Sequence, residues 1–391
     1  MPKTIKNDRV TTWEINGDHD TWTLEKQASI VVDDQAAIDV LNTSVANTLR
    51  LLGDILATGE DGQGVHVSGV NTKIVVGKSA DIVADEAIHA TAGGLSVVNR
   101  GDIDGFTYGI SNSAASTIRN FGDIGANIGI STLGTSKVVN GENGVIQGDF
   151  AGVVMTAGSD SVLINHGLIA GNDFAIRLLN GGETRLVNTG SIHGDIVFST
   201  GNDLFDTRKG TMDGTVTGGA GDDTYKIGKN DIAIVEADDG GHDALYSSAS
   251  IELADHIEDL FLRGKQNIDG EGNDEDNRIF GNAGDNFLYG KEGNDTLGGN
   301  AGDDALFGGD GDDVFVFNRG DDHDRIYNFI SGEDTIQMNG FEGIDSFADL
   351  STKMFKNGSD VWIQLGKGDR LVIKGIDTSD LDAADFDFNV L

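Results

Sequence analysis

Residues 272–316 consist of five consecutive nine-residue segments with no gap between them. The segments read GNDEDNRIF (272–280), GNAGDNFLY (281–289), GKEGNDTLG (290–298), GNAGDDALF (299–307) and GGDGDDVFV (308–316). Glycine opens every segment, an apolar residue stands eighth, and the sixth residues are Asn277, Asn286, Asp295, Asp304 and Asp313. A short fixed period indicates a solenoid, because each repeat buries its apolar side only against neighbouring repeats. We expect a turn over the first six residues and a short strand, with the eighth residue inward, over the last three.

This stretch resembles the repeat-in-toxin (RTX) calcium-binding nonapeptide, glycine-glycine-x-glycine-x-aspartate-x-apolar-x. The resemblance implies a parallel β-roll in which two nonapeptides complete one coil, so that each sixth residue lies over the sixth residue 18 positions later. Asp295 then lies over Asp313, and Asn286 over Asp304. Calcium takes about six to eight oxygen ligands, so stacked carboxylates supply some and carbonyl groups of the glycine-rich turns supply others.

Looser copies of the turn extend the predicted calcium-binding region in both directions. Three precede the array, GNDLF (201–205), GGAGDDTYK (218–226) and DGGHDAL (239–245), and two follow it, GDDHDRI (320–326) and SGEDTI (331–336). Their aspartates recur at intervals of 20 or 21 residues, which is one 18-residue coil with a short extension. The predicted Ca²⁺ ligands are Asp203, Asp223, Asp243, Asn286, Asp295, Asp304, Asp313, Asp324 and Asp334, with the carbonyl groups of Gly290, Glu292 and Asn294.

A longer repeat of about 22 residues occupies the chain before the calcium turns. Its copies include LRLLGDI (49–55), SVVNRGDI (96–103), TIRNFGDI (117–124), VVNGENGVI (138–146), VLINHGLI (162–169) and RLVNTGSI (185–192). The closing isoleucines are Ile55, Ile82, Ile103, Ile124, Ile146, Ile169 and Ile192. Two or three short strands per repeat, with glycine and asparagine at the corners, predict the stacked coils of a parallel β-helix.

Asparagine recurs at one corner of these coils, at Asn99, Asn120, Asn140, Asn165 and Asn188. Stacked asparagines form ladders of amide hydrogen bonds, so we interpret them as structural rather than catalytic. Residues 13–32, with Trp13 and Trp22, are interpreted as part of a cap on the open end of the solenoid.

The predicted fold class is all-β: a right-handed parallel β-helix that continues into a calcium-loaded parallel β-roll with a C-terminal β cap. The predicted domains are an N-terminal cap (1–48), the β-helix (49–199), the RTX β-roll (200–316) and a C-terminal cap with a secretion signal (317–391). Two paired β segments, VWIQL (361–365) and RLVIKG (370–375), are expected to close the roll.

Charge and composition exclude several classes of function. The 391 residues include 65 acidic and 27 basic side chains, and the net charge is −38. Such a chain does not bind nucleic acid or an anionic membrane electrostatically, and no apolar stretch is long enough to insert into a bilayer. The absence of cysteine excludes disulfides and cysteine-based zinc sites. Bound cations would offset the repulsion among the 42 acidic and 15 basic residues of 201–391.

The ends of the sequence bear on where the protein acts. The N-terminal residues contain no apolar segment of the kind found in cleaved secretory signals. The acidic and apolar residues 386–391 resemble the uncleaved C-terminal signals read by type I secretion systems of Gram-negative bacteria. We therefore expect an extracellular or cell-surface protein that engages a type I secretion apparatus during export.

RTX arrays often follow an enzyme, so catalytic motifs elsewhere in the chain would indicate an activity. The sequence contains no His-Glu-x-x-His, Gly-x-Ser-x-Gly or Ser-x-x-Lys motif, and the group Arg177, His193 and Asp195 is interpreted as exposed polar corners. Two functions remain. The sequence favours a secreted calcium-binding structural or adhesive protein without enzymatic activity. It leaves open whether calcium assembles this protein with further copies into an oligomer or lattice, or whether it stays a monomeric rod. The alternative is a β-helix polysaccharide-modifying enzyme (a lyase, epimerase or glycosidase) with an RTX tail, for which a polysaccharide is the partner.

Overall fold

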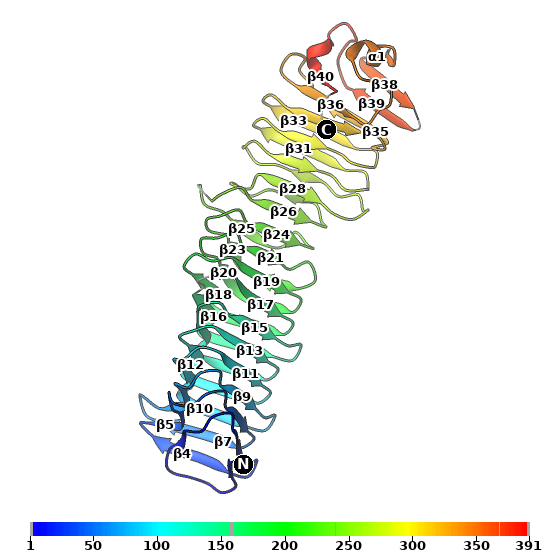
Figure 1. Ribbon diagram of the computed structural model, residues 1–391. Helices are drawn as coiled ribbons and strands as arrows, with labels where there is room; N and C mark the ends of the chain where they lie inside the picture. The colour runs from blue at the N-terminus through cyan, green and yellow to red at the C-terminus, as the bar shows by residue number, and fades with distance from the viewer. Residues whose placement is uncertain (1–2, 157–159, 239, 367, 389–391) are drawn as a thin grey trace. The chain divides into compact units, whose positions relative to one another are not determined.

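The computed structural model describes residues 3–156, 160–238, 240–366 and 368–388, nearly all of them in strands and turns (Figure 1). The helical segments among them are α1 (Phe347–Ser351) and the 3₁₀ turn η1 (Ala383–Asp385), and neither is long and apolar enough to cross a membrane. The chain forms two compact units. Unit 1 comprises Met1–Ala220 and Ile232–Ile234, and unit 2 comprises Gly221–Asp231 and Val235–Leu391.

Unit 1 is a parallel β-helix with two sheets. The first sheet consists of β1 (Lys3–Ile5), β3 (Thr21–Leu24), β6 (Thr48–Leu51), β9 (Lys73–Val76), β11 (Leu95–Asn99), β13 (Ser116–Asn120), β15 (Lys137–Asn140), β17 (Ser161–Asn165), β19 (Thr184–Asn188) and β21 (Leu204–Asp206). Each strand pairs in parallel with the strand of the next coil. The predicted β-helix is therefore confirmed.

The second sheet of unit 1 is also parallel throughout. It consists of β2 (Trp13–Ile15), β4 (Ser29–Asp33), β5 (Ala36–Val40), β7 (Asp54–Thr58), β8 (Gln63–Val67), β10 (Asp81–Ala90), β12 (Asp102–Asn112), β14 (Asp123–Leu133), β16 (Val145–Thr156), β18 (Leu168–Leu179), β20 (Ser191–Val197), β22 (Thr211–Asp213) and β23 (Thr215–Thr217). A further strand, β25 (Ala233–Val235), has residues in both units.

Isoleucine fills the centre of unit 1. The closing isoleucines of the repeat lie opposite one another on consecutive coils, from Ile55 to Ile192, and each is at most 1% exposed. From β10 onward, the two apolar segments expected to be separate strands lie in one long strand. Glycine permits the bend inside it, because the carbonyl of Tyr108 lies where a side chain on Gly105 would begin.

Residues assigned from the sequence to an N-terminal cap form strands of the same sheets. β1 pairs with β3, and β3 pairs with β6, both in parallel. Trp13 and Trp22 are 6% and 1% exposed, and their rings meet edge to face with centroids 5.6 Å apart. Both indole rings therefore pack inside the first coils.

The corner asparagines form the predicted ladder. The side-chain Nδ2 of Asn99 donates to Oδ1 of Asn120 at 2.9 Å, and the same bond continues to Asn140, Asn165 and Asn188 at 3.0, 2.9 and 2.9 Å. Each of these residues is at most 1% exposed. An amide carries both a donor and an acceptor, so each member satisfies its neighbours without an ion.

Asn140→Ala should destabilise unit 1 by about 1–3 kcal/mol, because buried partners on both neighbouring coils lose a hydrogen bond. Asn127→Ala is the matched control, since Asn127 is exposed on β14. Chemical denaturation followed by circular dichroism measures both changes. Equal losses from the two variants would show that the ladder contributes nothing specific.

Unit 2 also contains two sheets. One consists of β24 (Thr224–Ile227), β26 (Ala244–Ser247), β28 (Asp259–Leu262), β30 (Arg278–Phe280), β32 (Thr296–Gly298), β34 (Val314–Asn318), β36 (Thr335–Asn339) and β40 (Phe386–Asp387), paired in parallel in that order. The other consists of β27 (Ile251–Glu252), β29 (Gly270–Glu271), β31 (Phe287–Glu292), β33 (Ala305–Asp310), β35 (His323–Tyr327), β39 (Asp369–Ile373), β38 (Asp360–Gly366) and β37 (Met354–Asn357).

The second sheet of unit 2 changes direction at its C-terminal end. Its strands are parallel from β27 to β39, and β39, β38 and β37 then pair antiparallel. This is the predicted C-terminal β cap. Within the predicted secretion signal, Phe386 pairs with Ile336 of β36, and residues 389–391 lie outside the described residues.

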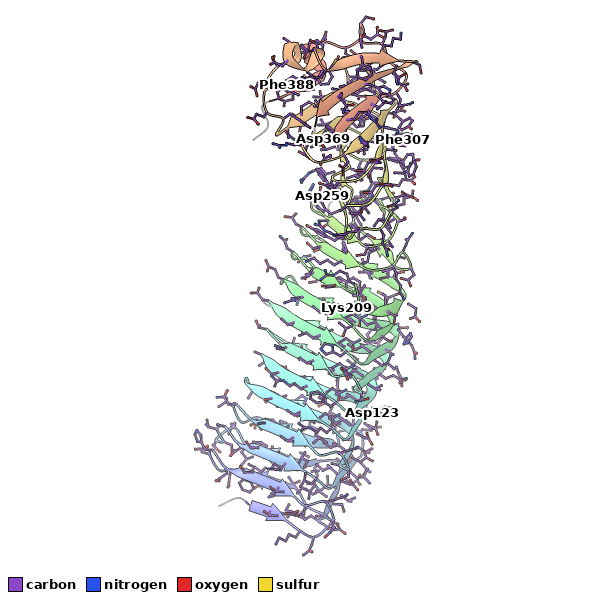
Figure 2. The ribbon with its side chains drawn as sticks, turned by 90° about the vertical axis from the view of Figure 1, so that its right-hand side faces the viewer. Asp123, Lys209, Asp259, Phe307, Asp369 and Phe388 are labelled. Atoms are coloured by element: carbon purple, nitrogen blue, oxygen red, sulfur yellow. The ribbon has the colours of Figure 1, made fainter. Side chains whose placement is uncertain are left out.

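Aromatic rings form a ladder on the second sheet of unit 2. Phe307, which is labelled in Figure 2, lies on β33. Its ring stacks between those of Tyr289 and Tyr327, with ring centroids 4.4 Å apart on both sides. These residues occupy the same position on β31, β33 and β35. Because each ring covers its neighbour, the ladder stabilises the stacking of the coils.

Candidate metal centre

The nine-residue segments of unit 2 fold as their spacing predicts. The eighth residues, Ile279, Leu288, Leu297, Leu306 and Phe315, are at most 1% exposed. Strands begin at the seventh residue of each segment and pair with the strand 18 residues later. The sixth residues are therefore stacked at the end of the turn, directly before the strands.

Stacked sixth residues form two hydrogen-bonded rows, one along each sheet. In the first row, the backbone N–H of Asn277 donates to Oδ1 of Asp295 at 2.8 Å. The row continues from Asp295 to Asp313 and from Asp313 to Asp334, each at 3.0 Å. In the second row, the N–H of Asn286 donates to Oδ1 of Asp304 at 2.6 Å, and that of Asp304 to Asp324 at 3.0 Å. We call these two rows the inner ladders.

The second carboxylate oxygen of most inner-ladder aspartates is buried and has no hydrogen-bond partner among the residues that the structure describes. This holds for Oδ2 of Asp295, Asp304, Asp313 and Asp324, and also for Oδ2 of Asp243. Each of these five residues is at most 1% exposed. An ionised carboxylate in such a position is costly unless it is paired or coordinates a metal ion.

Burial is the main cause of the raised carboxyl pKa values in these turns. It raises the pKa of Asp295 to about 7, of Asp304 to about 8 and of Asp313 to about 6. For Asp324, burial and the charge of Asp304 raise the pKa to about 9. Burial also raises the pKa of Asp334. Without a cation, these carboxyl groups in the folded turns thus keep their protons to a higher pH than an ordinary aspartate does.

The opening glycine of each segment makes room for these oxygens. Oδ2 of Asp295 lies where a Cβ on Gly290 would be, and the same relation joins Asp304 to Gly299 and Asp313 to Gly308. The carbonyl oxygen of Gly308, one coil later, also lies against Gly290. Carboxylate and carbonyl oxygens therefore converge at the opening glycine, and such hard donors suit Ca²⁺.

Two predicted ligands in the inner ladders have both side-chain polar atoms occupied. Oδ1 of Asn286 accepts from the N–H of Asn282, and its Nδ2 donates to the carbonyl of Ile268. Asp334 accepts at Oδ1 from Asp313 and at Oδ2 from the N–H of Ile330 at 2.8 Å. These residues stand at ends of the inner ladders, and their role as Ca²⁺ ligands stays a prediction.

The other predicted ligands lie at the following places. Gly290 and Glu292 are on β31, where the carbonyl of Gly290 lies against Gly272 and the side chain of Glu292 is exposed. Asp223 donates its N–H to Oδ1 of Asp243 at 2.7 Å within unit 2. Asp203 belongs to unit 1, and burial raises its pKa to about 7.

A second set of rows, which the sequence analysis missed, runs along the fifth residues on the exposed surface. The N–H of Asn294 donates to Oδ1 of Asp276 at 2.7 Å, that of Asp312 to Asn294 at 2.8 Å, and that of Asp303 to Asp285 at 3.0 Å. These bonds run toward the preceding coil, whereas the inner-ladder bonds run toward the next. The acidic residues at the fifth position were detectable as a nine-residue period.

The polar residues considered for catalysis do not converge in unit 1. Nδ1 of His193 lies 2.7 Å from Oδ2 of Asp213, while Asp195 accepts the N–H of Thr215 at 2.8 Å. The guanidinium of Arg177 lies over the ring of Phe174 at 4.9 Å. Each group therefore has its own partner on the outer face of the coils.

Comparison with known proteins identifies the repeats. The family model "RTX calcium-binding nonapeptide repeat (4 copies)" matches residues 271–297 and 292–324. Residues 271–324 are RTX calcium-binding repeats. This RTX array contains the turns with the unpartnered oxygens of Asp295, Asp304, Asp313 and Asp324, so calcium binding is supported by both pattern and geometry.

Two solved structures show similarity to parts of the chain. The extracellular lipase LipA from Serratia marcescens is 16% identical with a TM-score of 0.22, over 58% of this chain and 44% of the lipase chain. The AlgE6R3 subunit of the Azotobacter vinelandii mannuronan C5-epimerase is 24% identical with a TM-score of 0.26, over 36% of this chain and 83% of the subunit. The match thus spans less than half of the lipase. No curated protein matched the sequence.

Removing calcium at pH 7 should increase hydrogen exchange throughout the inner ladders of unit 2 and leave the asparagine ladder of unit 1 protected. In the metal-free state the folded pKa values of about 6 to 9 exceed the ~3.9 of an unfolded aspartate. Their contribution to stability is present below about pH 4 and is lost as the pH rises through 6 to 9. Mild acidification of the chelated protein should therefore restore part of the protection. Hydrogen-exchange protection in unit 2 that changes with neither chelator nor pH would contradict the assignment of these turns as a calcium site.

Proposed function

We propose that the chain is a secreted structural or adhesive protein of a bacterial surface or extracellular matrix, and that calcium folds its RTX array. The observation that carries the proposal is the set of buried Oδ2 atoms in consecutive turns for which the described part of the chain offers no hydrogen-bond partner. The residues that would hold the ions are Asp243, Asp295, Asp304, Asp313 and Asp324, with carbonyl groups of the glycine-rich turns.

The calcium concentrations outside cells suit such a fold. Extracellular calcium modules bind with dissociation constants of about 10⁻⁴–10⁻³ M. At tenfold excess of free ion, each site adds about 1.4 kcal/mol, so five independent sites would add about 7 kcal/mol. This is comparable with the whole stability of an ordinary domain. The array would stay unfolded where calcium is scarce and would fold outside the cell; export by a type I system stays a prediction.

Asp304→Asn should lower the number of bound calcium ions and weaken the cooperativity of binding, because it removes the charge of a buried ligand while keeping its shape. Asp303→Asn is the matched control, because the Asp303 side chain is 48% exposed and belongs to the row of fifth residues on the surface, which we call an outer row. Calorimetric titration of the full chain measures both. Equal changes in the two variants would mean that the acids act only as diffuse charge.

Self-assembly is the second part of the proposal. A net charge of −38 opposes contact between copies unless cations screen or bridge the surfaces. Light scattering at rising calcium, with ionic strength held constant by sodium, should show assembly above the concentration that folds the array. A protein that stays monomeric at millimolar calcium and high protein concentration would refute assembly and leave calcium-dependent folding intact.

A polysaccharide-modifying enzyme is the alternative, and one feature of unit 1 favours it. A groove across the long strands is lined by Phe106, Asn127, Gln147 and Asp149, and Phe106 is 84% exposed. Exposed aromatic and acidic side chains in a groove suit a sugar chain. Product formation from acidic polysaccharides in the presence of calcium, abolished by Asp149→Asn, would replace the non-enzymatic proposal with this one.

A further inference from the structure

One turn of unit 2 departs from the RTX pattern at its eighth residue. In GGAGDDTYK (218–226) that residue is Tyr225, where the array has Ile, Leu or Phe. Tyr225 points inward like its counterparts and is 1% exposed. Its hydroxyl group therefore enters an otherwise apolar interior and needs a polar partner there.

The partner is a glutamate that no repeat predicts. The Tyr225 hydroxyl donates to Oε1 of Glu236, and it lies 3.5 Å from Oδ2 of Asp223. Glu236 comes from the segment between two calcium-type turns and is 8% exposed. The combination of Tyr225 and Glu236 thus places an additional carboxylate beside the stacked aspartates.

Three carboxylates converge at this point. One oxygen from each of Asp223, Glu236 and Asp243 lies within 4.8 Å of the other two, and all three residues are buried. Asp243 is 0% exposed, and its Oδ1 accepts the N–H of Asp223. Its Oδ2 is buried and has no hydrogen-bond partner among the described residues. The cluster therefore contains an acceptor that nothing in the described chain satisfies.

We propose that Asp223, Glu236 and Asp243 form a distinct calcium site, outside the RTX array, with Glu236 as its third carboxylate. All three donors are oxygens, which suits a hard cation such as Ca²⁺. The inference deepens the proposed function and rests on it, because it assigns the order in which calcium fills the sites of unit 2. Tyr225 is a positioning residue that orients Glu236 through its hydroxyl group.

The number of charged ligands in the cluster determines when calcium fills it relative to the sites of the array. Calcium affinity rises with the number of charged ligands and with the rigidity of the site. Three converging carboxylates, with Glu236 held by Tyr225, exceed the stacked pair available to each array site. The cluster therefore binds first as calcium rises, before the array at 272–316 is filled.

Terbium(III) tests this assignment on the full chain, because it replaces calcium and emits when a nearby tyrosine transfers energy to it. In chelator-treated protein, the first terbium bound should give strong tyrosine-sensitised emission, and calcium should compete it away. Glu236→Gln should weaken terbium binding at this first site at least tenfold. Mutating a residue that only contacts a metal ligand already lowers metal affinity by about that factor. Glu342→Gln, which removes the same charge from an exposed position in unit 2, should leave the first site unchanged.

Tyr225→Phe supplies a second readout that keeps all three carboxylates. The variant should lose the sensitised emission of the first terbium ion, while direct excitation of terbium still reports a bound ion. This comparison keeps the test valid if Glu236→Gln prevents unit 2 from folding. Persistence of full sensitised emission in Tyr225→Phe would overturn the site.

The outcomes separate this inference from the proposed function. If Asp304→Asn lowers calcium stoichiometry but Glu236→Gln binds the first ion as tightly as the Glu342→Gln control, the three-carboxylate site is wrong and the calcium-folded array stands. If neither the unaltered chain nor any variant binds calcium at millimolar concentration, both fail together.

Discussion

A buried carboxylate has two oxygens. Among the described residues, a hydrogen-bond donor reaches only one oxygen in each of four stacked aspartates of unit 2, Asp295, Asp304, Asp313 and Asp324. Oδ1 of Asp313 accepts the N–H of Asp295 from the preceding coil, while Oδ2 is left beside the opening glycine Gly308. The outer rows use the neighbouring backbone N–H groups in the opposite direction, as in the bond from Asn294 to Asp276. Both of these backbone donors are therefore used by side chains, so the second oxygen is stabilised either by a proton or by a cation. A bound cation is the means that keeps the carboxylate ionised.

Unit 1 also stacks buried polar side chains along its coils, but these side chains are amides. Asn120 donates to Asn140 and accepts from Asn99, so the row is complete without charge. An aspartate row has no such side-chain donor. The two kinds of ladder are the physical basis for the prediction that the turns of unit 2 need calcium and that the β-helix does not. The same contrast appears within the array, where Asn286 has both side-chain polar atoms occupied and Asp304 does not.

The repeat spacing predicted only the contacts between equivalent residues of neighbouring coils. The 18-residue interval predicted that Asp295 and Asp313 stack, and the recurring asparagines predicted their ladder, because periodic coils place equivalent residues side by side. Spacing did not identify Glu236, which belongs to no repeat and reaches the site through tertiary packing against Tyr225. Nor did it show that Asp334 has both oxygens occupied, since that depends on the local backbone at Ile330.

Anomalous X-ray scattering from crystals grown with calcium measures the central claim most directly. We predict calcium peaks beside Oδ2 of Asp295, Asp304, Asp313 and Asp324, each next to the opening glycine of a segment. The asparagine row of unit 1 should show none. Well-ordered inner ladders without anomalous density at these oxygens would contradict the account, because the carboxylates would then be stable in the fold without a metal ion.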